Sequence, residues 1–435
     1  MATSPINDAE GAALFACLDG VAHAALAVSG GADSVALMEL ARRWRDQSGR
    51  DAPRLSVLSV DHALREGSDR EAAWVTERAR ALGLACTILR WEPGPKKNRI
   101  QADARQARYD LMADYAHANG LDALVTAHHL DDQAETLLMR LGRGSGLDGL
   151  TAIPEKGCWA GLPVFRPFLD VPKARLKATL EALGVEWLED PSNEDARFER
   201  VRLRRAMDRL ETLGLGAPAL ARSARRLRRA RNALDRITSL FLRDHGAYDP
   251  AGFCRIDAPA LHEAPEEIGL RAMARMISAV GGRGEAMPRL GKLEGLLEAL
   301  KSQADTSLAP SSLTLGGCRV IPGREEILVL REPGRTGLGD LTLNPGECGL
   351  WDNRYRVRLS ARSGAPVQVR ALGLRGYGEL RARLGRAVSL PESAADGLVS
   401  FWREEGLVAV PPLGFHAHSG ANAGCSADLV NPGLL

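Results

Sequence analysis

The hexapeptide at residues 29–34, Ser-Gly-Gly-Ala-Asp-Ser, has the residue types of a phosphate-binding loop. It follows an apolar run at residues 24–28 and leads into a helix-period run that begins at Val35. The two glycines allow positive φ and keep Cβ atoms away from an approaching anion. Backbone amides, the helix dipole and the two serine hydroxyls can then surround an anion of pyrophosphate size. The predicted loop consists of Ser29, Gly30, Gly31, Ala32, Asp33 and Ser34.

Asp33 is the unusual member of this loop, because a carboxylate among phosphates repels them unless a cation lies between. We therefore expect Asp33 to bind Mg²⁺. The sequence contains no Gly-x-x-x-x-Gly-Lys-Ser/Thr segment, which excludes a loop that grips the β- and γ-phosphates with its own lysine. A Gly-Gly turn capped by Ser or Asp is the alternative, but the full hexapeptide between a strand and a helix favours a nucleotide site.

A second chemical cluster occupies residues 126–136, Thr-Ala-His-His-Leu-Asp-Asp-Gln-Ala-Glu-Thr, between an apolar run and a helix-period run. Asp132 and Glu135 stand three residues apart, so both carboxylates can face the cavity that holds Asp33. A capping box with Asp131 or Asp132 as N-cap and Glu135 closing it is the alternative, and the two roles are compatible. Zinc binding by the adjacent histidines is disfavoured, because neighbours at i and i+1 diverge around a helix.

Two further segments place polar groups near the same edge of the predicted sheet. Asp61 and His62 end a predicted strand, where a capping role is the simpler alternative. Residues 98–109 open a helix on which Arg105 and Arg108 stand one turn apart. Both arginines can meet phosphates there, although solvated helix arginines are the commoner case.

Arginines are dense in two later stretches, residues 197–209 and 222–231. The net charge of +2 says little about a polyanionic partner, so local clustering carries the argument. A basic run is usually the solvated face of a helix, yet two such runs after a nucleotide-binding segment favour an RNA-binding surface. The candidate RNA-binding residues are Arg200, Arg202, Arg225, Arg226, Arg228 and Arg229.

The elements that must position these residues follow from the hydrophobic pattern. Helix-period runs predict three helices that alternate with four buried strands. This alternation is typical of right-handed βαβ units, which build a doubly wound parallel sheet with ligand sites at the carboxyl ends of its strands. The fold class is therefore α/β. The predicted strands lie at residues 24–28, 55–60, 85–91 and 123–127, and the helices at residues 35–46, 71–82 and 101–119.

The chain as a whole is expected to form three domains. We predict an N-terminal domain over residues 1–215, which ends after a helix at residues 172–183. A mainly helical middle domain follows over residues 216–332, with a basic helix at residues 219–243 and a hairpin at residues 313–330. Residues 340–435 mix short strands with one helix near residues 378–384, which predicts a small α/β C-terminal domain with a loose tail.

Bulk properties exclude several classes of protein. A chain of 435 residues with 45% apolar and 26% charged residues is expected to form two or three globular domains. Its seven cysteines are scattered and form no pair at metal-ligand spacing, which fits a reducing cytoplasm. No stretch reaches the roughly 18 apolar residues of a membrane span, and residues 1–10 carry no basic targeting region. We therefore expect a cytoplasmic protein without a membrane partner.

The hexapeptide resembles the PP-loop of the N-type ATP pyrophosphatases, a superfamily with an adenine nucleotide alpha hydrolase-like fold. Residues 60–65, 98–109 and 126–136 resemble the tRNA(Ile)-lysidine synthetase family in particular, and residues 190–193 resemble its Asp-Pro-Ser-Asn segment. The resemblance covers residues 20–210, and beyond them it extends only to general layout. Val201 and Arg205 depart from the Asn and His that the family often has there.

The resemblance implies a ligase that uses ATP and Mg²⁺. In such a ligase the loop would hold pyrophosphate. Asp61 and His62 would lie at the nucleotide, and Asp33 and Asp132 would bind Mg²⁺. The implied catalytic residues are Asp33, His128, Asp132, Glu135 and Arg108. A lysine substrate arrives protonated, because its reference pKa is about 10.4, and either Glu135 or His128 could accept the proton.

The implied reaction joins free L-lysine to C2 of the wobble cytidine in the CAU anticodon of tRNA(Ile). An adenylated cytidine forms first, because O2 of cytidine is a poor leaving group, and AMP and pyrophosphate are released. The tRNA and L-lysine are the expected partners, and a homodimer is a possible assembly.

Two alternatives remain, a second kind of enzyme and a protein of a different class. Another PP-loop tRNA-modifying or small-molecule adenylating ligase is one, although the chain offers neither paired cysteines for a thiolase nor a nucleophile motif for a glutamine-fed enzyme. An RNA-binding protein with a vestigial nucleotide fold is the other, and the intact Asp33, Asp132 and Glu135 argue against it.

Overall fold

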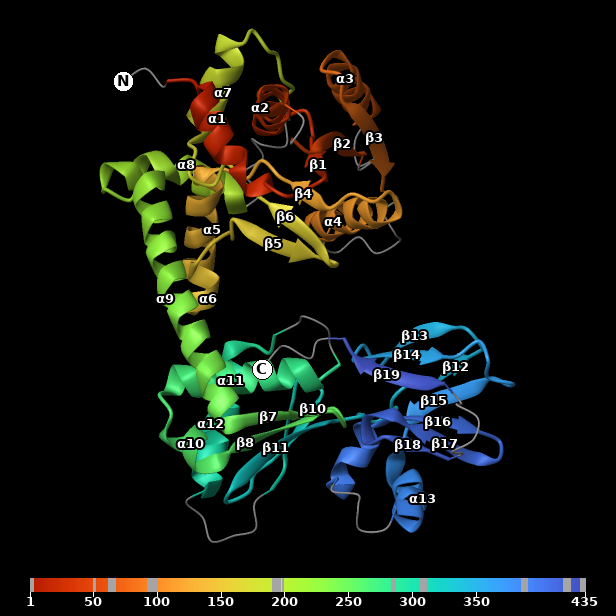
Figure 1. Ribbon diagram of the computed structural model, residues 1–435. Coiled ribbons are helices and arrows are strands. Elements are labelled where there is room, and N and C mark those ends of the chain that lie inside the picture. The colour runs from red at the N-terminus through yellow and green to blue at the C-terminus, as the bar shows by residue number, and fades with distance from the viewer. Residues whose placement is uncertain are drawn as a thin grey trace. The chain divides into compact units, whose positions relative to one another are not determined.

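The computed structural model describes the chain in two compact units, Met1–Arg231 and Asn232–Leu435 (Figure 1). Among the helices of the described residues, none combines the length and apolarity that crossing a membrane requires. The described residues are 4–49, 52–61, 68–91, 100–189, 197, 199–282, 287–304, 311–384, 390–417 and 424–430.

A six-stranded sheet forms the centre of the N-terminal unit, with the strand order β3-β2-β1-β4-β6-β5. All neighbouring strands are parallel except β5 and β6. The order reverses direction between β1 and β4, which creates a switch point where ligands of such sheets bind. The predicted α/β fold with a doubly wound sheet is therefore confirmed. The strands are β1 (His23–Ala27), β2 (Arg54–Asp61), β3 (Ala85–Arg90), β4 (Ala123–Val125), β5 (Lys156–Trp159) and β6 (Leu162–Phe165).

Helices cover both faces of this sheet and build a separate apolar core on each. On one face, α1, α2, α3 and α7 enclose a core that contains Phe15, Leu37 and Leu176. On the other face, α4 contributes Tyr109 and Met112. Full burial of a side chain of this size contributes about 1.5–3 kcal/mol, so the two cores fix the sheet and the strand ends. The helices are α1 (Asp8–Phe15), α2 (Ala32–Ser48), α3 (Ser68–Ala81), α4 (Ile100–Ala118), α5 (Leu130–Gly142), α6 (Leu147–Leu150), α7 (Lys173–Ala182), α8 (Glu199–Thr212) and α9 (Ala217–His245).

The second unit begins within α9 and contains a five-stranded antiparallel sheet in the order β7-β8-β11-β10-β9. The helices expected in this segment are present, and they pack on this sheet. The sequence predicted only the part of the sheet from β9 to β11, as a hairpin. Strands β7 and β8 are short, and β8 pairs with β11 from about 70 residues later, so their local pattern is weak. The elements are α10 (Ala258–Glu263), α11 (Glu266–Val280), α12 (Leu290–Ala304), β7 (Gly246–Asp249), β8 (Phe253–Asp257), β9 (Leu313–Leu315), β10 (Cys318–Ile321) and β11 (Glu326–Arg331).

The C-terminal part of the second unit holds two small sheets, β12-β15-β16-β17-β18 and β13-β14-β19, together with α13. Its strands and helix agree with the α/β module expected there. A buried ion-pair cluster joins it to β11, because Asp352 accepts from both Arg331 and Arg354. The division into three domains stays a prediction. The elements are β12 (Leu341–Leu343), β13 (Cys348–Trp351), β14 (Tyr355–Leu359), β15 (Val367–Ala371), α13 (Gly373–Leu384), β16 (Val399–Arg403), β17 (Gly406–Val410), β18 (Phe415–His416) and β19 (Cys425–Leu429).

Candidate functional site

The loop between β1 and α2 turns at Gly30, whose φ of 91° lies in the region that favours glycine. A Cβ atom there would lie 2.8 Å from Cδ1 of Leu188, and the Leu188 amide donates to the Gly30 carbonyl at 2.9 Å. Gly31 differs, because it has an ordinary φ of −70° as the N-cap of α2. The expectation of positive φ at both glycines therefore holds only for Gly30.

The serine hydroxyls of this loop also differ in their roles. Ser34 lies in the first turn of α2, where its Oγ accepts from the Ser29 amide at 3.1 Å and donates to the Gly31 carbonyl at 2.9 Å. It therefore stabilises the loop itself, whereas Ser29 is exposed. Because α2 begins at Ala32, one turn earlier than expected, the amides of residues 32–34 belong to a helix start, where backbone donors lack partners within the helix.

Two predicted metal carboxylates converge on a single histidine. Nε2 of His129 lies 3.4 Å from Oδ2 of Asp33 and 3.5 Å from Oδ2 of Asp132. The second cation beside Asp33 is Lys173, whose Nζ lies 3.2 Å from the same Oδ2. The structure thus brings Asp33 and Asp132 together at the carboxyl edge of the sheet, as the sequence predicted, and adds two cations that the sequence analysis missed.

His129 lies inside this carboxylate cluster with 2% of its surface exposed. Burial alone would lower its pKa, but hydrogen bonds with Asp131 and Asp33 and the charges of Asp132 and Asp33 raise the pKa to about 10. The imidazolium in turn lowers the pKa of Asp33 against the effect of burial, with Lys173 contributing further.

His128, the histidine chosen from the sequence, turns elsewhere. Its Nδ1 lies 2.8 Å from Oγ1 of Thr126, so it is held at the end of β4. The backbone changes from strand to helix at these two histidines, and the turn sends their rings in different directions. The adjacent pair by itself could not reveal which ring enters the cluster.

Three helix starts meet at this cluster and explain its geometry. Asp132 accepts from the His129 amide at 3.1 Å, so His129 is the N-cap of α5 and Asp132 closes the box. The capping box expected from Asp131 or Asp132 to Glu135 is therefore wrong, because α5 begins earlier. Asp131 instead reaches across to α7 and accepts from the Lys173 amide at 2.9 Å. Helix starts of α2, α5 and α7 together favour negative charge here.

Glu135 lies on α5 beyond this cluster, and its side chain is only 2% exposed. Burial raises its pKa, while Arg204 on α8 opposes that shift by donating from Nε to Oε1 at 2.9 Å. Oε2 of Glu135 is buried and has no hydrogen-bond partner among the described residues. Arg200 also acts on this carboxylate by its charge.

Arg204 carried a signal that the sequence analysis did not use. Residues 200 and 204 stand one helical turn apart and share a face of α8. Arg202 lies on a different face, is exposed and donates to the Arg197 carbonyl. The helical period thus separates an arginine that lines the site from one that lies on the surface.

Other predicted residues have mixed placements. Asp61 ends β2 with 7% exposure, its Oδ2 3.9 Å from Nε of Arg90, whereas His62 lies outside the described residues. Arg108 is half-buried on α4, and the side chain of Arg105 is not among those described.

The arginines of α9 do not form one surface. Arg226 and Arg229 are exposed. Arg225 pairs with Asp170 at 2.8 Å, and half-buried Arg228 donates to the carbonyls of Thr151 and Ile153. Arg228 therefore holds a loop of its own unit, unlike its exposed neighbours.

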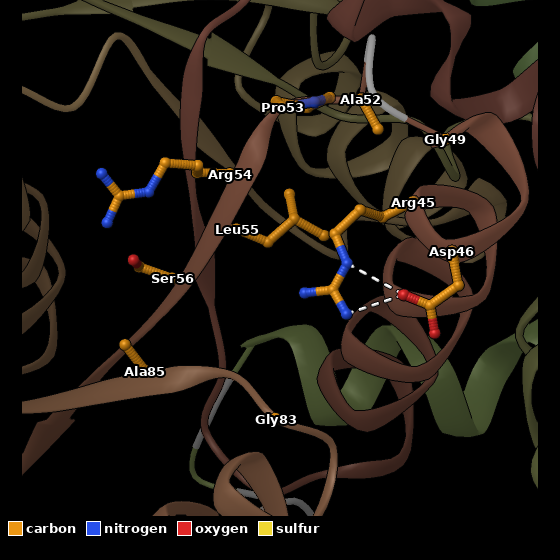
Figure 2. Close-up of a pocket in the computed structure, with 10 residues that line it drawn as sticks. All are labelled: Arg45, Asp46, Gly49, Ala52, Pro53, Arg54, Leu55, Ser56, Gly83 and Ala85. Carbon is orange, nitrogen blue, oxygen red and sulfur yellow. Dashed lines mark hydrogen bonds and ion pairs between the residues drawn. The ribbon is translucent and has the colours of Figure 1, made fainter.

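A pocket of about 500 Å³ opens at the opposite edge of the sheet, near the amino ends of β2 and β3 (Figure 2). Arg54, Ser56 and Ala85 line it, and the guanidinium of Arg45 is directed at Asp46 within it. None of the predicted site residues lines this pocket. Because ligands of such sheets bind at the carboxyl ends, the candidate site is the loop and carboxylate cluster instead.

Comparison with protein families agrees with the loop. Residues 10–210 match a family model described as a PP-loop domain. A solved structure of a U34-tRNA thiolase from Methanococcus maripaludis is 17% identical, with a TM-score of 0.43 over 50% of this chain and 78% of that chain.

Closer relatives extend beyond the first domain. A tRNA(Ile)-lysidine synthase from Bradyrhizobium diazoefficiens is 42% identical over 78% of this chain and 97% of that protein. Another from Ruegeria pomeroyi is 37% identical over 89% of this chain and 88% of that protein, and one from Rhodopseudomonas palustris is 41% identical over 76% and 97%. The resemblance found in the sequence motifs is thereby confirmed, and the chain belongs to the tRNA(Ile)-lysidine synthase family.

Proposed function

We propose that this chain joins free L-lysine to C2 of the wobble cytidine in the CAU anticodon of tRNA(Ile), with cleavage of ATP to AMP and pyrophosphate. Membership of the family supports the reaction. The observation that carries the proposal is the convergence of the loop, Asp33 and Asp132 at one edge of the sheet. A nucleotide bound there would meet amides that can donate to its phosphates and carboxylates that can hold a cation. ATP, tRNA and lysine meet in the cytoplasm, where we place the reaction.

Asp33 and Asp132 are suited to hold Mg²⁺. Oδ1 of Asp33 is buried without a hydrogen-bond partner among the described residues, which is costly unless a ligand completes it. Mg²⁺ is commonly held by one or two carboxylates together with substrate phosphates, and the cluster offers such a pair. When bound, the ion would neutralise phosphate charge. The donor set therefore fits the metal.

The loop and the helix starts would bind and orient the nucleotide. Amides at the start of α2 and the positive end of its dipole attract the pyrophosphate part. O2 of the cytidine then attacks the α-phosphorus, and the bond to the bridging oxygen breaks. The protein contributes positioning and electrostatic stabilisation to this step rather than a covalent intermediate.

Glu135 is the group that we assign to the lysine substrate. Its raised pKa makes it a better proton acceptor than an ordinary carboxylate, and its buried charge would select a cationic side chain. Lysine must lose a proton before its amine attacks C2, after which AMP departs. His128 remains the second candidate for this proton, and Arg108 for a phosphate contact.

Contact with tRNA requires accessible cations. We assign it to the exposed Arg202, Arg225, Arg226 and Arg229 and to the half-buried Arg200 beside Glu135. Phosphate contacts of this kind make binding weaken steeply with salt. We leave Arg228 out of this proposed set, because its guanidinium donates to two carbonyls of its own unit.

Nucleoside analysis provides the direct test. The full chain is incubated with ATP, Mg²⁺, labelled lysine and tRNA(Ile), and a tRNA with a different anticodon serves as the control. A lysine-modified cytidine, formed with one AMP per lysine, supports the proposal. In a parallel reaction with a sulfur donor added, sulfur incorporation would instead indicate a thiolase. No product with any tRNA would indicate a binding protein.

A further inference from the structure

Lys173 lies against the phosphate loop although it is 140 residues away in sequence. Its Nζ lies 3.2 Å from Oδ2 of Asp33, and its side chain is 32% exposed. It is the first residue of α7, a ten-residue helix whose N-terminus points at the same cluster. None of the sequence motifs includes Lys173.

The backbone around Lys173 is fixed from both sides. Its amide donates to Oδ2 of Asp131 at 2.9 Å, and two residues earlier the Val171 carbonyl accepts from the Leu130 amide at 3.0 Å. These bonds join the starts of α5 and α7. The position of the Lys173 main chain relative to the loop therefore does not depend on its own side chain.

Neutralising Asp33 does not by itself explain why Lys173 lies at this loop. His129 already lies 3.4 Å from the same oxygen and is itself buried among carboxylates. An ammonium group has three donors on a flexible stem, and partial exposure leaves it free to turn from Asp33 to an anion beside it.

We propose that Lys173 binds the pyrophosphate leaving group of ATP and supplies the cation that the loop itself lacks. This inference rests on the proposed function. When the cytidine O2 forms its bond to the α-phosphorus, the bond to the bridging oxygen breaks and its electron pair stays on pyrophosphate. The Lys173 ammonium neutralises the charge that develops there, while no proton is transferred in this step.

Three variants test this role in the full chain with Mg²⁺ present. Lys173→Ala and Lys173→Gln remove the charge, and Lys173→Arg keeps it. Lys177→Ala is the matched control, because Lys177 lies one turn later on α7 and pairs with Glu189 at 3.3 Å. The readouts are kcat, the KM values for ATP and lysine, inhibition by added pyrophosphate, and direct binding of Mg²⁺-pyrophosphate by calorimetry.

We expect Lys173→Ala and Lys173→Gln to lose about 100-fold in kcat/KM for ATP, the size of effect seen when one preorganised electrostatic donor is removed. Pyrophosphate should inhibit and bind at least about tenfold more weakly, since one charge-assisted contact to it is lost. The KM for lysine should not change, and Lys173→Arg should restore most pyrophosphate binding. Lys177→Ala should behave as the wild type.

The inference would be overturned if Lys173→Gln and the wild type bound pyrophosphate equally well, however far activity falls. A lysine that acts only as a structural counter-ion would lower activity without weakening pyrophosphate binding. Failure of the proposed function is a separate outcome. A wild-type chain that makes no lysidine would reject that function, while the calorimetric comparison of the same variants would still decide whether Lys173 binds pyrophosphate.

Discussion

The ion pair between Glu135 and Arg204 offers a quantitative test of the electrostatics of the site. The Glu135 side chain is 2% exposed and the Arg204 side chain is 40% exposed. Arg204→Ala leaves the carboxylate buried and removes the donor that lies 2.9 Å from its Oε1. Arg200 remains nearby, but it acts on Glu135 only by its charge.

The expected loss of stability follows from this burial. Breaking a fully buried ion pair by removing one partner costs about 3–5 kcal/mol, because the remaining charge is uncompensated. The exposed end of Arg204 places this pair at the low end, at about 3 kcal/mol. For a unit of 150–250 residues, each kcal/mol lowers Tm by about 2–4 °C, so the N-terminal unit should melt about 6–12 °C earlier.

The pH dependence gives the prediction its sign. Burial raises the pKa of Glu135 above 4.5, its ordinary value, and Arg204 limits that rise. A carboxyl with a raised pKa in the folded protein loses stability as pH rises from its unfolded pKa through its folded pKa. Without Arg204 the folded pKa rises further, so the loss should be small near pH 4.5 and largest at neutral and alkaline pH.

Calorimetric unfolding of the full chain at pH 5 and pH 8 is the assay. Arg202→Ala, an exposed change on another face of α8, is the control and should leave Tm unchanged. Glu135→Gln combined with Arg204→Ala should recover most of the stability, since no buried charge remains. The reasoning is refuted if Arg204→Ala melts with the control at pH 8, or if the double variant is no more stable than Arg204→Ala.

Three further predictions concern the loop, α9 and the cysteines. Gly30→Ala should destabilise by about 1–2 kcal/mol from its positive φ alone and should abolish ATP binding, whereas Gly31→Ala, with nothing within 4 Å of its Cβ, should fold normally by the same thermal assay. Arg228→Ala should lower stability by about 1–3 kcal/mol, because two carbonyls lose a donor. Arg226→Ala should weaken tRNA binding and flatten its salt dependence without changing Tm. Equal effects of the two variants on the salt dependence would contradict the assignment. Burial raises the pKa of the Cys17 and Cys425 thiols to about 11, so iodoacetamide at pH 8 should modify exposed Cys158 and Cys348 first. The rate of modification of Cys17 and Cys425 should then rise about tenfold per pH unit up to pH 10. Mass spectrometry of the labelled peptides measures the order, and the opposite order would show that burial does not control reactivity.

The sequence alone determined the features that depend on residues close together in the chain. The strand, glycine loop and helix at residues 23–48 follow from apolar runs and a turn, so the loop and Asp33 were found without a structure. The alternation of strands and helices likewise predicted the parallel sheet and the edge at which Asp132 would meet Asp33.

The tertiary structure decided which side chains complete the site. Lys173 and Arg204 reach Asp33 and Glu135 from helices 140 and 69 residues away. The helical period groups Arg204 with Arg200, but the local sequence does not identify the carboxylate that either Lys173 or Arg204 contacts. The turn at residues 128–129 placed the His129 ring beside Asp33 and the His128 ring beside Thr126. Packing on the loop at residues 151–153 gave Arg228 two carbonyl partners of its own unit. Local pattern fixes periodicity and exposure, but distances between elements are set only when the cores of the sheet form. Charges that attract one another across such distances are therefore a property of the fold.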